Sequence, residues 1–369
     1  MRSRRAHVFP SQFMRQFVKN ILIISIPTLI VLFVLLEIFF RVAVPANDWP
    51  YACFDQSERI FKFCPPGDEG TATFGWLASQ RGRWRVNNHG WVSPIDYDTS
   101  KSKPRIAVFG DSYIEAQQVD CDKSFPSVLR SEIGDRYDVY SFGVSGASLS
   151  EYVNMNRYVN RTFAPDVLIF NLRHNDFLES IYELNRGDTI MMMLDITDDS
   201  ITETRPRPDY SFTEFNWKKR LLRKSAVVRY LIYNLRIKLV IQNLYSRDTY
   251  SGNVSVTNVE RHRELIVTAT EYLFDRIKAE NPGRRIIVVM PAPRHAIYDG
   301  TVTESKVLFL NDLVAELSIE YGFEHLDLTE SMTRDYEANG IEFNSPWDAH
   351  WDEYGHDFVA RQVLSLGWP

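Results

Sequence analysis

A Gly-Asp-Ser sequence at 110–112 begins at the last residue of the short apolar run RIAVFG at 105–110. An apolar run of this length predicts a buried strand, and the glycine allows a sharp turn behind it. Ser112 is therefore expected at the carboxyl end of a strand and the start of a helix. Open α/β sheets bind ligands at that position, and a helix N-terminus favours negative charge. Asp111 and Ser112 are also ordinary helix caps, so this block alone does not establish a catalytic serine.

Three further blocks follow predicted strand ends or lie in the last loop. The turn VSG at 144–146 offers backbone N–H groups that suit an oxyanion, and RHN at 173–175 offers an amide side chain. The segment DAH at 348–350 offers a carboxylate and an imidazole. Because the carboxyl ends of parallel strands lie at one edge of a sheet, one parallel sheet would gather all four blocks at a single site.

These blocks, in this order, resemble the SGNH/GDSL hydrolase superfamily over residues 104–369. The layout further resembles membrane-anchored bacterial SGNH proteins associated with cell-surface polysaccharide modification. The resemblance implies a Ser-His-Asp set made of Ser112, His350 and Asp348. It also implies an oxyanion hole made of the Ser112 amide, Gly146 and Asn175.

Two features depart from the family pattern. The carboxylate and the imidazole are spaced Asp-x-His, whereas the family commonly has Asp-x-x-His. Arg173 stands where relatives often have glycine, and it either recognises an anionic substrate or pairs with a surface carboxylate. Asp111, Arg173 and His174 are the predicted substrate-binding residues.

The implied chemistry is acyl transfer through a covalent intermediate. A histidine base takes the proton of the serine, and the oxyanion hole stabilises the tetrahedral intermediate. We expect an esterase that acts on ester-linked acyl groups, chiefly O-acetyl groups, of cell-envelope carbohydrate. Two alternatives stay open: an O-acyltransferase to an exopolysaccharide, and a catalytically inactive glycan-binding or scaffold module of a polysaccharide assembly complex.

A second Asp/His pair, Asp352 and His356, competes with the first. Its i, i+4 spacing fits a final helix, and we interpret His356 as a packed helix residue. Asp348, His350, Asp352 and His356 together would offer carboxylate and imidazole ligands, but no other ligand cluster supports a zinc site. The sequence predicts no metal and no cofactor.

Alternating strand and helix patterns predict how these blocks are positioned. Apolar runs predict five strands at 105–110, 137–143, 166–172, 284–291 and 323–328. The segments between them predict helices at 125–133, 150–161, 259–280 and 305–321, with a last helix after Tyr354. This alternation is typical of a three-layer α/β/α sandwich with a central parallel sheet of about five strands, here flavodoxin-like.

The N-terminal segment predicts a membrane anchor. Residues 21–44 are apolar except for four positions, and a helix of that length at about 1.5 Å per residue crosses a hydrocarbon layer of about 30 Å. Five basic residues and no acidic residue precede it, which predicts a cytoplasmic N-terminus and an exported body. Glu37 and Arg41 are spaced to pair near its far end. We expect a single-pass inner-membrane protein with its catalytic domain in the periplasm.

Composition excludes other classes. The chain has 369 residues and a net charge of −6; residues 1–41 carry +5, so the remainder carries −11. An acidic body of this kind argues against a nucleic-acid partner.

Three cysteines are too few for a disulfide scaffold. In an oxidising compartment Cys53 and Cys64 would pair, and three free thiols are the equal alternative.

The predicted organisation has four parts and one insertion. Residues 1–20 form a basic tail, 21–44 the anchor, 45–103 a connector with a small β-rich lead-in that turns at 88–90, and 104–369 the hydrolase domain. An insertion at about 176–258 contains a methionine run and a basic amphipathic stretch. The basic face is either solvated or in contact with anionic lipid or acidic polysaccharide. The predicted partners are an acylated carbohydrate substrate, the membrane and polysaccharide machinery of the envelope.

Overall fold

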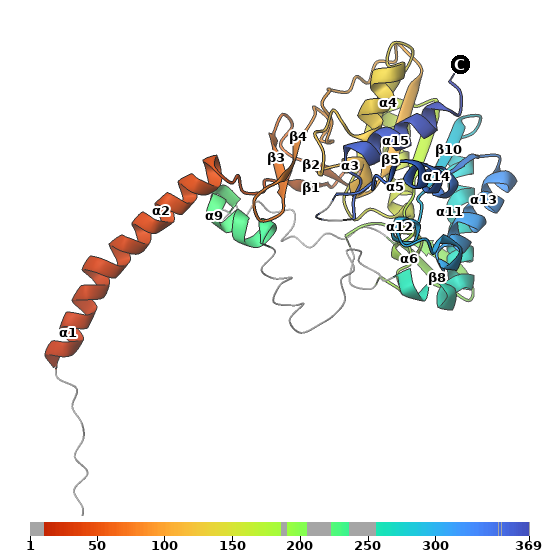
Figure 1. Cartoon of the computed structure of the whole chain (residues 1–369). Helices are drawn as coiled ribbons and strands as arrows, with labels where there is room; N and C mark the ends of the chain where they lie inside the picture. The colour runs from red at the N-terminus through yellow and green to blue at the C-terminus, as the bar shows by residue number, and fades with distance from the viewer. Residues whose placement is uncertain are drawn as a thin grey trace, which may run out of the picture.

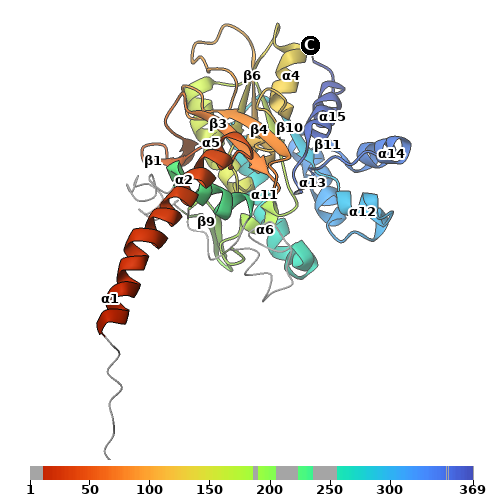
Figure 2. The same ribbon diagram turned by 60° about the vertical axis from the view of Figure 1, so that its left-hand side comes forward.

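A computed structural model describes residues 11–185, 190–204, 223–235, 256–345, 347 and 349–368. A long N-terminal helix projects from an α/β body (Figure 1). Viewed from a second direction, the same helix again leads into the side of the body that carries β3 and β4 (Figure 2).

A five-stranded parallel sheet forms the centre of the body. Its strands are β5 (Arg105–Gly110), β6 (Asp138–Gly143), β7 (Val167–Asn171), β10 (Arg285–Met290) and β11 (Glu324–Asp327). Their spatial order is β11-β10-β7-β5-β6, so the chain first adds β6 on one side of β5 and then adds β7 on the other. This is the flavodoxin-like order, and it confirms the predicted fold.

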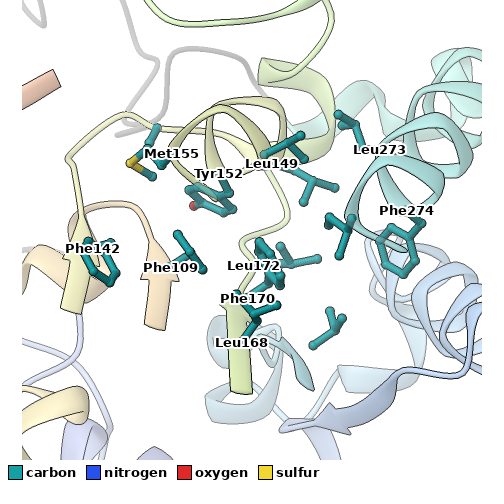
Figure 3. Close-up of a cluster of buried hydrophobic side chains, with 14 of the residues drawn as sticks. Phe109, Phe142, Leu149, Tyr152, Met155, Leu168, Phe170, Leu172, Leu273 and Phe274 are labelled. Carbon is teal, nitrogen blue, oxygen red and sulfur yellow. The ribbon is translucent and has the colours of Figure 1, made fainter. Parts of the chain in front are cut away.

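Helices cover both faces of the sheet because the strands are apolar on both faces. In β5, Ala107 and Phe109 belong to one buried cluster, whereas Ile106 and Val108 belong to another. The first cluster contains side chains of α5 (Leu149–Phe163), α11 (Arg263–Glu280) and α13 (Leu308–Tyr321). The second contains side chains of α4 (Phe125–Ile133) and α15 (Glu353–Leu364). Figure 3 shows part of the first cluster, where α5 and the α11 side chains Leu273 and Phe274 pack near Phe170.

Short elements complete the body. Those at or near the carboxyl edge are α3 (Ser112–Glu115), α6 (Asp176–Glu179), α12 (Arg294–Tyr298), η4 (Val302–Glu304) and α14 (Thr329–Asn339). The sequence patterns did not predict α12 or α14, which follow β10 and β11 as extra helical segments.

The region before the sheet consists of two hairpins. Strand β1 (Ala52–Asp55) pairs with β2 (Ile60–Phe63), and β3 (Glu69–Phe74) pairs with β4 (Gln80–Arg85), both antiparallel. The bridge between Val86 and Val92 encloses the turn expected at 88–90. Phe63, Phe74 and Trp84 form a small core of their own here.

The N-terminal helix runs through α1 (Ser11–Asn20), a π-helical turn η1 (Ile21–Ser25) and α2 (Ile26–Val42). Its stretch Met14–Val42 is long and apolar enough to cross a membrane, with a mean hydropathy of 2.8 over its most apolar window. None of that window is buried against the rest of the described protein. Arg41 pairs with Glu37 as the i, i+4 spacing predicts.

Parts of the predicted insertion are described. They comprise the hairpin β8 (Leu194–Thr197) and β9 (Ser200–Glu203), the segment α9 (Ala226–Arg229) with η2 (Tyr230–Asn234), and η3 (Val256–His262). Met192 and Met193 are buried, so this part of the methionine run packs in the hydrophobic interior. The basic residues at 217–222 and 236–238 of the amphipathic stretch lie outside the described residues.

All three cysteines are free thiols in the structure. Cys53 lies on β1 and Cys64 directly follows β2, where the Cys64 N–H donates to the Tyr51 carbonyl. The sequence-based alternative of three free thiols therefore describes this state of the protein.

Candidate active site

Ser112 begins α3 immediately after β5 ends. The Asp111 carboxylate caps this helix by accepting a hydrogen bond of 2.9 Å from the Tyr113 N–H. The cap fixes the turn between strand and helix and leaves the Ser112 side chain half-buried at the carboxyl edge of the sheet. Asp111 therefore has a local structural reason to precede Ser112.

His350 meets Ser112 although the two residues are 238 positions apart. His350 Nε2 lies 2.7 Å from Ser112 Oγ. A nucleophile and a base at this distance can exchange a proton directly. The geometry therefore places the predicted base within reach of the predicted nucleophile.

The loop that carries His350 is closed by backbone contacts. Ser345 N–H donates to the His350 carbonyl at 2.9 Å, and Asn344 bridges to Trp351. Asp348 lies in this loop but outside the described residues, so its role as the orienting carboxylate stays a prediction.

Two side chains from other elements hold the same loop. The Tyr113 hydroxyl and Arg294 Nη2 both donate to the Ala349 carbonyl, one residue before His350. Arg294 also donates to the Tyr113 hydroxyl at 2.6 Å. Arg294 is buried at the start of α12, so it supports the loop from beneath rather than from solvent. The sequence analysis missed Arg294, because its contacts with Tyr113 and Ala349 form only when the separate elements pack.

The candidate oxyanion donors lie at neighbouring strand ends. Gly146 follows β6 and Asn175 follows β7, and these strands flank β5, which leads to Ser112. Gly146 has φ +82°, a left-handed conformation that favours glycine. The Ser112 N–H, the Gly146 N–H and the Asn175 amide donate no hydrogen bond to any other residue in the described ranges. Three donors that are not otherwise engaged are what an oxyanion hole requires.

Glu115 ties the Gly146 turn to the serine helix. Its buried carboxylate accepts hydrogen bonds of 2.6 Å from both the N–H and the hydroxyl of Ser145. Burial raises the pKa of Glu115, against the lowering effect of the Ser145 hydrogen bonds. The sequence analysis missed this contact because an acidic residue in a first helical turn is ordinary in any helix.

Buried charge surrounds the nucleophile. Burial raises the pKa of Asp111, while the Arg173 guanidinium and His350 act to lower it. Burial also raises the pKa of Asp176 well above its ordinary value, and the nearby Asp111 carboxylate adds to this effect. Arg173 lies over the Tyr113 ring, with its guanidinium carbon 3.6 Å from the ring centroid. Its charge therefore favours the ionised form of the buried Asp111 carboxyl beside Ser112.

His174 is directed toward another element. Its Nε2 lies 2.9 Å from Asn311 Oδ1 of α13. Since the Asn311 amide nitrogen donates to Pro291 and Asp327, its oxygen is the acceptor and His174 the donor. Burial lowers the pKa of His174 to about 4, so the ring is neutral near pH 7. His174 thus braces the strand end next to Asn175 against α13.

The second Asp/His pair has structural roles. Asp352 caps α15 by accepting from the Gly355 N–H at 2.9 Å. His356 is buried, and its Nδ1 accepts a hydrogen bond of 3.1 Å from the Phe125 N–H. Burial lowers the pKa of His356 to about 3. These contacts confirm that His356 is a packed helix residue.

No group of three or more potential metal-ligating side chains, His, Cys, Asp or Glu, occurs within the described part of the chain, which does not include Asp348.

Comparisons with known proteins identify the family. Residues 108–358 match the model of the GDSL-like Lipase/Acylhydrolase family. The chain is similar in structure to a member of the lipolytic protein G-D-S-L family from Veillonella parvula DSM 2008, with 10% identity, 71% of this chain and 97% of that chain covered, and a TM-score of 0.41. It is similar to the acetyl xylan esterase AlAXEase, with 10% identity, 71% and 98% covered, and a TM-score of 0.41. It is also similar to a carbohydrate acetylesterase family member from Sinorhizobium meliloti, with 13% identity, 71% and 96% covered, and a TM-score of 0.33. A comparison with curated proteins finds no match.

Proposed function

Because this chain belongs to the GDSL-like lipase/acylhydrolase family and is an ester-bond hydrolase, we propose that it removes O-acyl groups, chiefly O-acetyl groups, from cell-envelope carbohydrate. The observation that carries the assignment of the site is the 2.7 Å contact between Ser112 Oγ and His350 Nε2.

In the proposed mechanism, His350 Nε2 takes the proton of Ser112 Oγ while that oxygen bonds to the acyl carbon. The former carbonyl oxygen becomes an oxyanion, which the Ser112 N–H, the Gly146 N–H and the Asn175 amide stabilise. The bond between the acyl carbon and the sugar oxygen then breaks, and the imidazolium gives its proton to that oxygen, which leaves as a hydroxyl group. Water repeats the sequence on the acyl-enzyme, and the acid and the free serine are released. Asp348 would hold the imidazole in the required tautomer.

The proposal of a carbohydrate substrate has two supports. The ordered sequence blocks resemble those of SGNH proteins associated with cell-surface polysaccharide. An indole ring also lies three residues before His350: Trp347 is 42% exposed and offers an apolar face on which a sugar ring can pack. Arg173 and Asp111 are proposed to act on substrate indirectly, through the charge around Ser112, and His174 through its brace on the Asn175 strand end.

We also propose an inner-membrane location with the hydrolase domain in the periplasm. The apolar helix Met14–Val42 and the basic residues before it support a cytoplasmic N-terminus. The proposed parts are the tail 1–20, the anchor 21–44, the connector 45–103 and the hydrolase domain 104–369 with its insertion at about 176–258.

Acetate release from an acetylated oligosaccharide tests this function. The full chain in detergent should release acetate and react with a fluorophosphonate probe. Ser112→Ala should lose both properties, with kcat lowered by at least about 10³-fold. Ser131→Ala, which changes an exposed serine on α4, is the matched control and should behave as the wild type. A folded wild-type protein that neither reacts with the probe nor releases acetate would instead favour the glycan-binding module.

Adding an unacetylated acceptor sugar separates hydrolysis from transfer. A hydrolase releases the same amount of acetate with or without the acceptor. Acetylation of the acceptor at the expense of acetate release would replace the esterase proposal with the acyltransferase.

A further inference from the structure

Six large apolar side chains are exposed on the side of the body that α2 enters. They come from three separate segments and have exposed fractions from 39% to 60%. They are Trp49, Trp76, Leu77, Leu231, Ile232 and Tyr233. We call this group the collar. Exposed apolar side chains of this size, gathered on one side of a protein, indicate an interaction surface.

Glu37 attaches the segment that carries the collar residues Leu231, Ile232 and Tyr233 to the end of the N-terminal helix. Its carboxylate accepts hydrogen bonds from the N–H groups of Ala226 at 2.9 Å and Val227 at 3.1 Å, and from the Ser225 hydroxyl at 2.9 Å. These contacts supply hydrogen-bond donors to a carboxylate near the end of an otherwise apolar helix. The same carboxylate caps the first turn of α9.

Aromatic and polar contacts continue this attachment into the collar. The Phe40 and Tyr230 rings stack with their centroids 3.9 Å apart. The Tyr230 hydroxyl donates to the Trp76 carbonyl, and the Asn234 amide donates to Thr73 Oγ1 at 2.9 Å. Trp49 stacks on Tyr233 at 5.7 Å. The collar is therefore fixed to the helix end through side-chain contacts rather than through chain connectivity alone.

The length of the apolar helix sets the level of the collar. At about 1.5 Å per residue, the twenty residues Ile21–Phe40 span about 30 Å, which matches a hydrocarbon layer. Glu37 and Arg41 then lie at its outer boundary. Figure 1 shows α9 against this end of α2, with β3 and β4 beyond it.

We propose that the collar rests in the interfacial layer of the lipid bilayer from which α2 emerges. This inference rests on the proposed membrane anchor and goes beyond the proposed esterase activity. Tryptophan and tyrosine side chains favour the headgroup level, where one part of the ring is apolar and the other part is hydrated. The collar supplies two tryptophans and a tyrosine at that level.

Apolar contact, not charge, carries the attachment. Arg229 and Arg223 beside the collar already face Asp48, at 3.0 Å and 3.7 Å. Arg41 is paired with Glu37. Because these three cations have carboxylate partners, the proposal rests on the apolar side chains rather than on the charge of these three residues.

The collar adjoins the loop that carries His350. At Gly75, an added Cβ would lie 2.6 Å from the Trp347 ring, so the ring packs directly on the turn that presents Trp76. The Ser345 hydroxyl also donates to the Gln80 side chain at the start of β4. Seating the collar on lipid therefore holds the catalytic loop near the membrane surface.

Fluorescence quenching by brominated lipid tests the proposal. The full chain is reconstituted in nanodiscs of phosphatidylcholine brominated either near the headgroup or deep in the acyl chain. Shallow bromines should quench the wild-type protein more than deep ones. Trp76→Phe and Trp49→Phe should each reduce the shallow quenching by more than one quarter. Trp368→Phe, near the C-terminus, is the matched control and should leave it unchanged.

Equal shallow quenching in Trp76→Phe, Trp49→Phe and wild type would overturn the proposal. So would Trp76 fluorescence that is unquenched by lipid and instead responds to an added acetylated oligosaccharide, because the occupant would then be a glycan.

Hydrogen exchange of residues 226–234 gives a second measurement. Nanodiscs should slow this exchange at least threefold relative to detergent, and Ile232→Glu should abolish the difference.

Separate readouts distinguish failure of this inference from failure of its premises. Resistance of the full chain to alkaline extraction from membranes tests the anchor alone. Hydrolysis of a soluble ester tests the active site alone. If the protein is anchored and active but lipid bromines do not quench Trp49 and Trp76, only the proposal that the collar contacts lipid is overturned.

Discussion

The carboxyl edge of the sheet and the collar both join parts of the chain that are far apart in sequence, but by different means. At the edge, Ser112, Gly146 and Asn175 each follow a strand whose place is fixed by backbone pairing with its neighbours. At the collar, Glu37 reaches Val227 across 190 residues through side-chain contacts alone. Many backbone hydrogen bonds position the first region, whereas a few side chains position the second.

This difference predicts different responses to substitution. Removing one chemical group at the sheet edge should abolish a reaction step while the backbone keeps its place. Removing one side chain at the collar should loosen a segment while the chemistry continues. The following changes test that contrast, from the largest expected effect to the smallest.

His350→Ala should have the largest effect on catalysis. Loss of the base should lower kcat for a soluble acetyl ester by at least about 10³-fold, with the melting temperature within a few degrees of the wild type. His356→Ala is the comparison, because it removes a buried acceptor and should mainly destabilise the fold, by about 1–3 kcal/mol. Kinetics and thermal unfolding in one detergent measure both. Similar losses of activity in two well-folded variants would contradict the assignment.

Asn175→Ala should lower kcat by about 10²-fold with little change in KM, because an oxyanion donor acts mainly in the transition state. Asn339→Ala, near the end of α14, is the matched control. A kcat within threefold of the wild type would remove Asn175 from the proposed oxyanion hole.

Lowering the pH should destabilise the protein through His356. Its native pKa of about 3 lies below the unfolded value of about 6.5, so only the unfolded state gains a proton as pH falls between them. The stability contributed by neutral His356 is present above pH 6.5 and is lost at up to about 1.4 kcal/mol per pH unit below it. Unfolding in denaturant at pH 7 and pH 5 should therefore show a steeper loss in wild type than in His356→Gln. Equal slopes would show that His356 does not contribute to the pH dependence.

Tyr113→Phe should reduce kcat by about tenfold, because Ala349 loses one hydrogen bond of about 1.5 kcal/mol that holds the His350 loop. KM should stay within twofold, which separates positioning from substrate binding. Arg294→Lys, which retains a charge but not the guanidinium, should give a similar kcat effect. A purely structural role would lower the melting temperature and leave the kcat of the folded fraction unchanged.

Glu37→Gln should give the smallest effect. Loss of the charged cap should weaken protection of the 226–228 amides by about 1 kcal/mol and leave kcat for a soluble ester unchanged. Hydrogen exchange in nanodiscs measures the change, and Glu330→Gln, an exposed carboxylate on α14, is the control. If Glu37→Gln lowers kcat without changing the hydrogen exchange of the 226–228 amides, Glu37 acts on catalysis rather than on the α9 segment, and the contrast between the two regions is wrong.

Much of the sheet edge was predictable from sequence. The helix expected at 125–133 is α4, and each of the five expected strands is present with ends shifted by at most one residue. Apolar runs and the turns after them specify these elements, and parallel pairing then brings their ends together. Ser112 was expected at this edge for that reason, whereas its pairing with His350 was implied by the resemblance to the SGNH/GDSL superfamily.

Contacts between side chains of separate elements were not predictable. Arg294 at the start of α12 and Glu115 in α3 are ordinary helix residues in the sequence, and Glu37 was expected only to pair with Arg41. Their partners, Ala349, Ser145 and Val227, become neighbours only when the elements pack.

The sequence by itself determined the order of strands and helices, the apolar N-terminal helix and the polar groups that follow each strand, because periodicity and local turn preferences act over a few residues. Tertiary structure alone decided that Tyr113 and Arg294 hold the His350 loop, that Arg173 lies over the Tyr113 ring, and that Glu37 caps α9. These contacts depend on distances and angles between packed elements, for which no short-range pattern in the chain exists.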